Sequence, residues 1–85
     1  MYGINLVTVA QVLSVALGGN ALFSKNGVVK SIYQEIVKYS AQQDIDMVKV
    51  MMRTLAQQNQ QAYDDVVETL REHFSEQDLL DILPS

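Results

Sequence analysis

His73 is the only histidine in the chain, and therefore the only imidazole that could act as a general acid or base near neutral pH. Catalysis by histidine requires a nucleophile to activate or a carboxylate that orients the ring. Arg71, Glu72 and Glu76 are close in sequence. Such charged neighbours are common at the end of a surface helix, where a histidine also complements the helix dipole. The sequence therefore predicts no catalytic residue, and we expect the protein not to be an enzyme.

Asp64, Glu68 and Glu72 recur every four residues and would share one face of a helix. Three carboxylates without a histidine or an oxygen-rich loop make a weak site for a hard cation. The chain has no cysteine that could supply a thiolate ligand. It also lacks an EF-hand loop, a phosphate-binding glycine loop and a dinucleotide fingerprint. We expect neither a metal nor a cofactor.

The charged residues are distributed unevenly along the chain. Residues 1–24 carry no charge, residues 25–60 have a net charge of +2, and residues 61–85 have a net charge of −6. An acidic carboxy-terminal third repels phosphate and disfavours nucleic-acid binding. It would attract a partner protein with a basic surface, through a face formed by Asp64, Asp65, Glu68 and Glu72. The simpler alternative is a solvated face that keeps the protein soluble.

Basic residues in the middle of the chain support another hypothesis. Lys25, Lys30 and Arg53 could hold an anionic small ligand in a pocket between subunits.

The stretch from residue 4 to residue 23 is uncharged and about as long as a membrane span. Polar residues and glycines interrupt it, and no basic residue precedes it as in a signal peptide. Leu6, Val9 and Leu13 share a stripe at helical spacing. We expect a buried or interface helix over residues 4–17 that ends at Gly18-Gly19-Asn20, with membrane association through residues 4–23 as the alternative. A chain without cysteine is compatible with the cytoplasm, which is the compartment we expect.

Helical periodicity returns after the turn dipeptide Asn26-Gly27 and predicts a helix over 28–41. Ser40 and Gln43 then fit a capping-box pattern for the start of the next helix. We expect that helix over 43–72, either continuous or broken near 57–61, where glutamine and asparagine are concentrated.

Apolar residues within this region advance by alternate steps of three and four, which is the pattern of a heptad seam. The seam consists of Ile45, Val48, Met52, Leu55, Asn59, Ala62 and Val66. It predicts either a coiled coil between copies of the chain or an antiparallel hairpin within one chain. Asn59 would fix the register of a coiled coil, or else lie at a break between two shorter helices.

The end of the chain carries signals for a short helix over 76–83. Ser75 has the side chain of an N-cap and precedes acidic residues. Phe74 and Leu79 fit a hydrophobic staple, and Pro84 would end the helix. A helix this short must pack on its own domain or on a partner.

Together these features predict one all-α domain over residues 1–85. We expect a small helical bundle or helical hairpin of three to five helices, completed within the chain or by self-association into a homodimer or higher homo-oligomer. The function we expect is that of an adaptor, inhibitor or assembly chaperone that binds another protein. The candidate contact residues, in addition to the acidic face, are Val50, Met51, Tyr63, Leu80 and Leu83.

Overall fold

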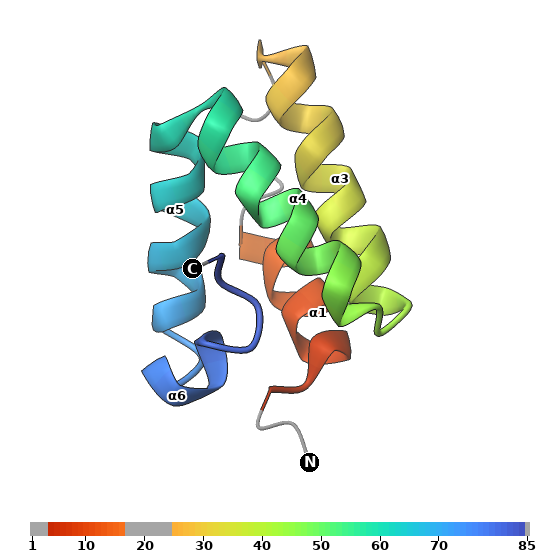
Figure 1. Cartoon of the computed structure of the whole chain (residues 1–85), viewed down its shortest axis with the longest axis vertical. Helices are drawn as coiled ribbons and strands as arrows, with labels where there is room; N and C mark the ends of the chain where they lie inside the picture. The colour runs from red at the N-terminus through yellow and green to blue at the C-terminus, as the bar shows by residue number, and fades with distance from the viewer. Residues whose placement is uncertain (1–3, 17–24, 85) are drawn as a thin grey trace.

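The computed structural model describes residues 4–16 and 25–84, and these residues form an all-α bundle (Figure 1). Helix α3 packs against α4 and α1, and α5 packs against α4 and α1 on another side. The chain then turns through the short α6 and runs back beside α5. The helices are α1 (Leu6–Ala16), α3 (Gly27–Ala41), α4 (Ile45–Gln58), α5 (Gln60–Arg71) and α6 (Glu76–Leu79).

Helix α1 begins at Leu6 because the preceding asparagine caps it. The Asn5 side-chain oxygen accepts hydrogen bonds from the backbone N–H groups of Val7 at 3.0 Å and Thr8 at 3.3 Å. The observed helix therefore starts two residues later than the predicted helix over 4–17, and Ile4 is buried just ahead of it. The predicted end at Gly18-Gly19-Asn20 lies outside the described residues.

Helix α3 has well-defined ends. Asn26 caps its start, with its side-chain oxygen accepting from the N–H groups of Val28 and Val29, both at 3.1 Å. At its other end Gln43 adopts a left-handed backbone conformation with φ of 60°. The N–H of Asp44 then donates to the carbonyl of Tyr39, and that of Gln43 to the carbonyl of Ser40. This pair of bonds is a Schellman motif, which stops the helix and turns the chain into α4.

The predicted capping box of Ser40 and Gln43 is wrong. Ser40 lies within α3 and is fully buried, and its hydroxyl has no hydrogen-bond partner. The cap of α4 is Asp44, whose carboxylate accepts from the N–H of Met47 at 3.2 Å. The Schellman motif moves the start of α4 beyond the position that the sequence pattern indicated.

The predicted helix over 43–72 is two helices that meet at a single residue. Asn59 has extended backbone angles, φ −158° and ψ 101°. Its own N–H donates to the carbonyl of Leu55, which closes α4, and its side chain accepts from the N–H of Ala62 at 3.0 Å, which caps α5. Of the two hypotheses for Asn59, the break is confirmed and the register-fixing role in a coiled coil is not seen.

The carboxy-terminal helix is shorter than the predicted 76–83. Ser75 caps α6 as expected, because its hydroxyl accepts from the N–H of Asp78 at 3.1 Å. After Leu79 the chain tightens, and the N–H groups of Asp81 and Ile82 bond three residues back instead of four. In such a turn residues three apart lie one above the other. Leu79 and Ile82 are consequently both fully buried, while Leu80 points outward.

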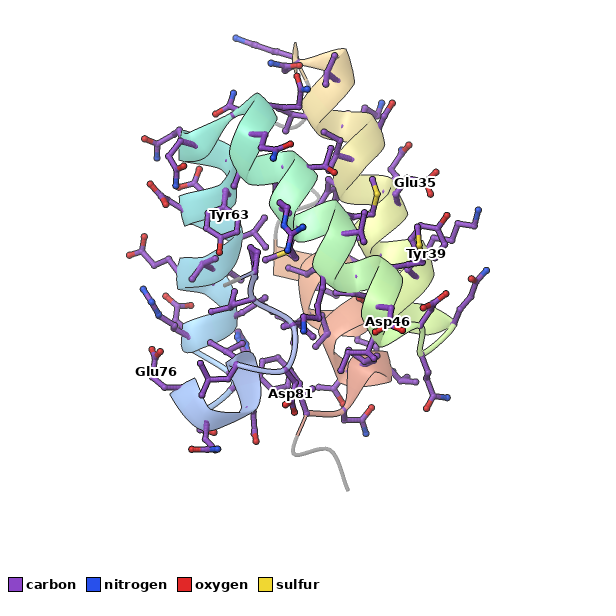
Figure 2. The ribbon with its side chains drawn as sticks, viewed as in Figure 1. Glu35, Tyr39, Asp46, Tyr63, Glu76 and Asp81 are labelled. Carbon is purple, nitrogen blue, oxygen red and sulfur yellow. The ribbon has the colours of Figure 1, made fainter. Side chains whose placement is uncertain are left out.

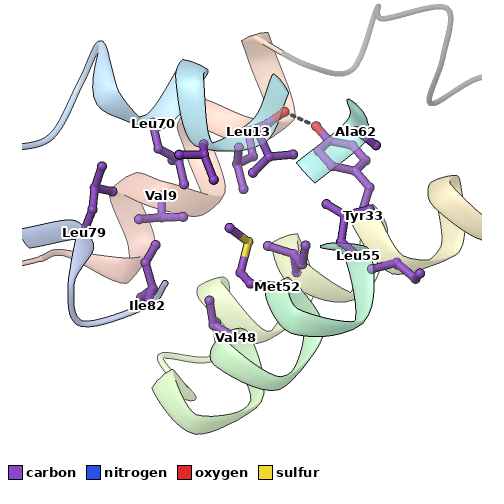
Figure 3. Packing of buried hydrophobic residues seen from close by; sticks show 14 of the residues in the cluster. Val9, Leu13, Tyr33, Val48, Met52, Leu55, Ala62, Leu70, Leu79 and Ile82 are labelled. Carbon is purple, nitrogen blue, oxygen red and sulfur yellow. Dashed lines mark hydrogen bonds between the residues drawn. The ribbon is translucent and has the colours of Figure 1, made fainter. Parts of the chain in front are cut away.

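Side chains from the five helices of the described residues and from the carboxy-terminal segment fill one core (Figure 3). Its fully buried members include Val9, Leu13, Met52 and Leu70. The hydroxyl of Tyr33 crosses from α3 to donate a hydrogen bond to the carbonyl of Leu13 near the end of α1. Burial raises the pKa of this tyrosine above its ordinary value.

Within the described residues, no helix has both the length and the hydropathy needed to cross a bilayer. Residues 17–23 of the uncharged stretch lie outside the described part of the chain.

Candidate functional site

A hollow of about 360 Å³ lies between α5 and the carboxy-terminal segment. We call it the α5 hollow. Its lining residues are Tyr63, Asp64, Val67, Glu68, Arg71 and Leu83.

Helix geometry explains why five of these residues share one surface. Residues of an α-helix advance by about 100° each, so Tyr63, Val67 and Arg71 form one row at a spacing of four. Asp64 and Glu68 form the neighbouring row. The first row begins with apolar side chains and the second row is acidic, so the hollow has an apolar edge and an acidic edge.

Leu83 completes the apolar edge from the other side. Ile82 is fully buried and holds the carboxy-terminal segment against the core. Leu83 is half-buried beside it and faces the hollow. Figure 2 shows Tyr63 on the part of α5 near this segment.

The acidic side chains of α5 differ in how far they are already engaged. Asp64 accepts a hydrogen bond from the Gln60 amide at 2.9 Å, and Asp65 accepts one from the Gln61 amide at 3.1 Å. Glu68 is exposed and makes no hydrogen bond or ion pair with any described residue. Its carboxylate is thus free to bind a cation at the edge of the hollow.

Arg71 brings a positive charge to one end of the hollow. Its Nε lies 2.8 Å from a carboxylate oxygen of Glu76 at the start of α6, and both side chains are exposed. Figure 2 shows Glu76 on the outer side of this corner. The ion pair links α5 to α6 and offsets part of the arginine charge, although an exposed pair adds only about 0–1 kcal/mol to stability.

Tyr63 is half-buried, and its pKa is raised above the ordinary value. The main cause is burial, followed by the negative charge of Asp64, while Arg71 acts in the opposite direction. The hydroxyl therefore keeps its proton at neutral pH and can donate a hydrogen bond, while the ring offers an apolar face.

Four of the predicted contact residues meet at the α5 hollow, namely Tyr63, Asp64, Glu68 and Leu83. Val67 and Arg71 were missed. Their spacing of four and eight residues from Tyr63 was a usable signal, because it places all three in one row of the helix. Asp65 is half-buried, and Glu72 is exposed at the end of α5 outside the hollow.

The other predicted contact residues lie elsewhere. Leu80, 65% exposed, lines a separate hollow of about 200 Å³ with residues from the start of α4 and with Asp81. Val50 is 49% exposed on α4, whereas Met51 is half-buried and packs against the core. The structure does not gather these residues and the α5 hollow into one site.

The heptad seam lies inside the single chain. Ile45 is partly buried and packs against the core. The five seam residues with no exposed surface are Val48, Met52, Leu55, Ala62 and Val66. The seam therefore closes an intramolecular hairpin of α4 and α5, and a second copy could reach these side chains only if the fold opened. The predicted self-association has to use other residues.

Lys25, Lys30 and Arg53 are exposed, and none of them lines the hollows described above. His73 is also exposed, with its Nδ1 at 3.1 Å from the carbonyl oxygen of Thr69. Among the residues that the structure describes, no group of three or more histidine or acidic side chains is arranged to hold a metal ion.

The chain matches no protein-family model, and it shows no significant similarity to a curated protein or to a solved structure. We therefore propose its function from the residues and the geometry described above.

Proposed function

We propose that this protein is a non-enzymatic interaction module that binds a partner protein with a basic surface through the α5 hollow. The observation that carries the proposal is the combination of an apolar edge and an unengaged carboxylate in one hollow. The proposal covers adaptors, inhibitors and assembly chaperones, since each of these acts by binding another protein.

The apolar edge suits the anchor of a partner segment. Binding energy at protein interfaces is concentrated in a few side chains that fill pockets, and tyrosine is enriched among such residues. Tyr63 and Leu83 are half-buried and offer apolar surface of this kind, and the buried Val67 also lines the hollow. The volume is at the lower end of the range of about 300–1,000 Å³ found for small-molecule pockets, which suits one or two side chains of a partner.

The charge of the carboxy-terminal third of the chain supports a basic partner. Residues 61–85 contain seven acidic residues and one arginine. A surface with this excess attracts a cationic partner over a distance and raises the association rate, an effect that salt screens. Association should therefore slow as the salt concentration rises, and an unchanged rate would remove the steering part of the proposal.

Self-association and a cytoplasmic location remain predictions. The apolar side chains that stay exposed in the described residues include Val7, Val15, Val28, Val50 and Leu80. A second copy would have to contact residues such as these. Light scattering tests this point, because a monomer has a mass of 9.5 kDa.

The proposal can be tested by selecting short peptides from a randomised display library against the immobilised protein. The matched counter-target is the double variant Asp64→Lys/Glu68→Lys, whose fold is checked by circular dichroism. Both substituted residues are exposed on a helix, so the variant should fold. We expect cationic peptides with apolar side chains that lose at least about tenfold in affinity for the variant, since close charge pairs reverse from attraction to repulsion.

Two results would count against this function. Peptides that bind the protein and the variant equally would place the binding surface elsewhere. No enrichment on the natural sequence over the variant would remove the basic-partner proposal.

A further inference from the structure

We infer that the α5 hollow receives one arginine side chain of the partner, lying across helix α5. Its aliphatic part would rest on the apolar edge formed by Tyr63, Val67 and Leu83. Its guanidinium would reach the acidic edge formed by Asp64 and Glu68. This inference rests on the proposed function and specifies the chemistry of the occupant.

The order of the lining residues around α5 supports this orientation. At about 100° per residue, Tyr63, Val67, Asp64 and Glu68 follow one another around the helix over roughly 140°. Arg71 falls between Val67 and Asp64 in angle but lies farther along the helix axis. Apolar side chains come first and carboxylates last. An occupant that is apolar along its stem and charged at its end matches this gradient, as arginine and lysine side chains do.

The acidic edge favours arginine over lysine. Asp64 and Glu68 lie one helical turn apart, so their carboxylates project side by side. The planar guanidinium presents several N–H donors in a fixed fork that can engage two acceptor oxygens at once, whereas an ammonium acts as a point charge. The guanidinium is also more weakly hydrated and stacks on aromatic rings such as that of Tyr63.

Arg71 is the feature that opposes a basic occupant. It lies a further turn along α5, and its Nε bonds to Glu76 outside the hollow. The three charged lining residues have a net charge of −1, and Glu76 makes the local group more negative. The hollow thus still favours a cation at the end occupied by Asp64 and Glu68.

The inference is tested by NMR titration of the uniformly ¹⁵N-labelled full chain with Nα-acetyl-arginine-N-methylamide. Norleucine, lysine and glutamate derivatives with the same blocking groups are titrated in parallel. We expect saturable shifts of the Tyr63, Val67, Glu68 and Leu83 amides with the arginine probe and weaker binding of the other three. The variant Glu68→Gln should weaken arginine binding about threefold, the size expected for one exposed ion pair.

Glu72→Gln is the matched control, because Glu72 is exposed at the end of α5 and does not line the hollow. It should leave arginine binding unchanged. The inference is overturned if the arginine probe does not bind at the hollow, if both variants have the same effect, or if the lysine or glutamate probe binds as well as arginine. In those cases the selected peptides could still depend on Asp64 and Glu68, and the proposed function would stand. The proposed function fails only if the peptide selection fails, so the two failures can be told apart.

Discussion

The two faces of helix α5 differ in how deeply their side chains are buried. The inner face presents Ala62, Val66 and Leu70, which are fully buried against the core. The outer face presents Tyr63 and Glu68, which line an open hollow. The seam pattern predicts either a contact with another copy or a hairpin within one chain, and the inner face forms the hairpin. A regular apolar stripe indicates that a helix face is covered, but it does not indicate whether the cover comes from the same chain.

The largest effect should come from the inner face. Leu70→Ala removes a fully buried side chain and should lower the free energy of unfolding by about 3 kcal/mol. Glu68→Ala on the outer face should change it by less than about 0.5 kcal/mol, because Glu68 is exposed and unpaired. Urea denaturation followed by circular dichroism measures both. Equal losses would remove the distinction between the faces.

The same comparison extends to the carboxy-terminal segment. Ile82 is fully buried and Leu80 is 65% exposed. Ile82→Ala should therefore lower the free energy of unfolding by about 2–3 kcal/mol. Leu80→Ala should change it by less than about 0.5 kcal/mol. Thermal unfolding of the two variants makes the comparison. A stable Ile82→Ala protein would show that this segment is not held by the core.

A smaller effect is expected at the start of α5. Asn59→Ala removes the side chain that caps the helix at 3.0 Å and should lower the unfolding free energy by about 1 kcal/mol. Asn59→Asp should retain most of the stability, because an aspartate side chain caps equally well. The exposed neighbour Gln58 provides the control, since Gln58→Ala should have little effect. If Asn59 stabilised a register between chains instead, its loss would depend on protein concentration.

The smallest effect concerns pH. Burial raises the pKa of Tyr33 on the inner side, and burial together with Asp64 raises that of Tyr63 on the outer side, against the effect of Arg71. Above a pH of about 10 the unfolded chain releases these protons while the folded chain keeps them, so the free energy of unfolding should fall as pH rises. Their contribution is fully present below that pH.

Two variants separate the tyrosines in this experiment. Tyr33→Phe should reduce the loss of unfolding free energy at alkaline pH more than Tyr63→Phe does, because Tyr33 is the more buried residue. Denaturation at a series of pH values from about 8 to about 11 gives the dependence of the unfolding free energy on pH for each protein. An identical slope in all three proteins would show that neither tyrosine is linked to folding.

Local signals predicted much of the fold. The cap at Ser75 was predictable because capping depends on the side chain and on its near neighbours. The helix after Asn26-Gly27 was predictable from its apolar periodicity. The failure at Ser40 has a different origin. A serine followed three residues later by glutamine resembles a cap, but α3 runs through Ser40 to Ala41 and is stopped only by the left-handed conformation of Gln43.

The candidate site was predicted only in part, for a physical reason. Tyr63, Asp64 and Glu68 share one helix, so their proximity follows from their spacing. Leu83 was placed in a regular helix, and its position beside α5 depends on the tighter turn after Leu79, which packing selects. Sequence alone could not decide which leucines of that segment enter the core.

The most direct test of the central claim is to map where a selected cationic peptide contacts the ¹⁵N-labelled protein by chemical-shift perturbation. We expect the largest shifts at Tyr63, Val67, Glu68 and Leu83, around the α5 hollow. Shifts centred on the exposed Val50 of α4, with those four amides unchanged, would contradict the claim that the outer face of α5 is the binding surface.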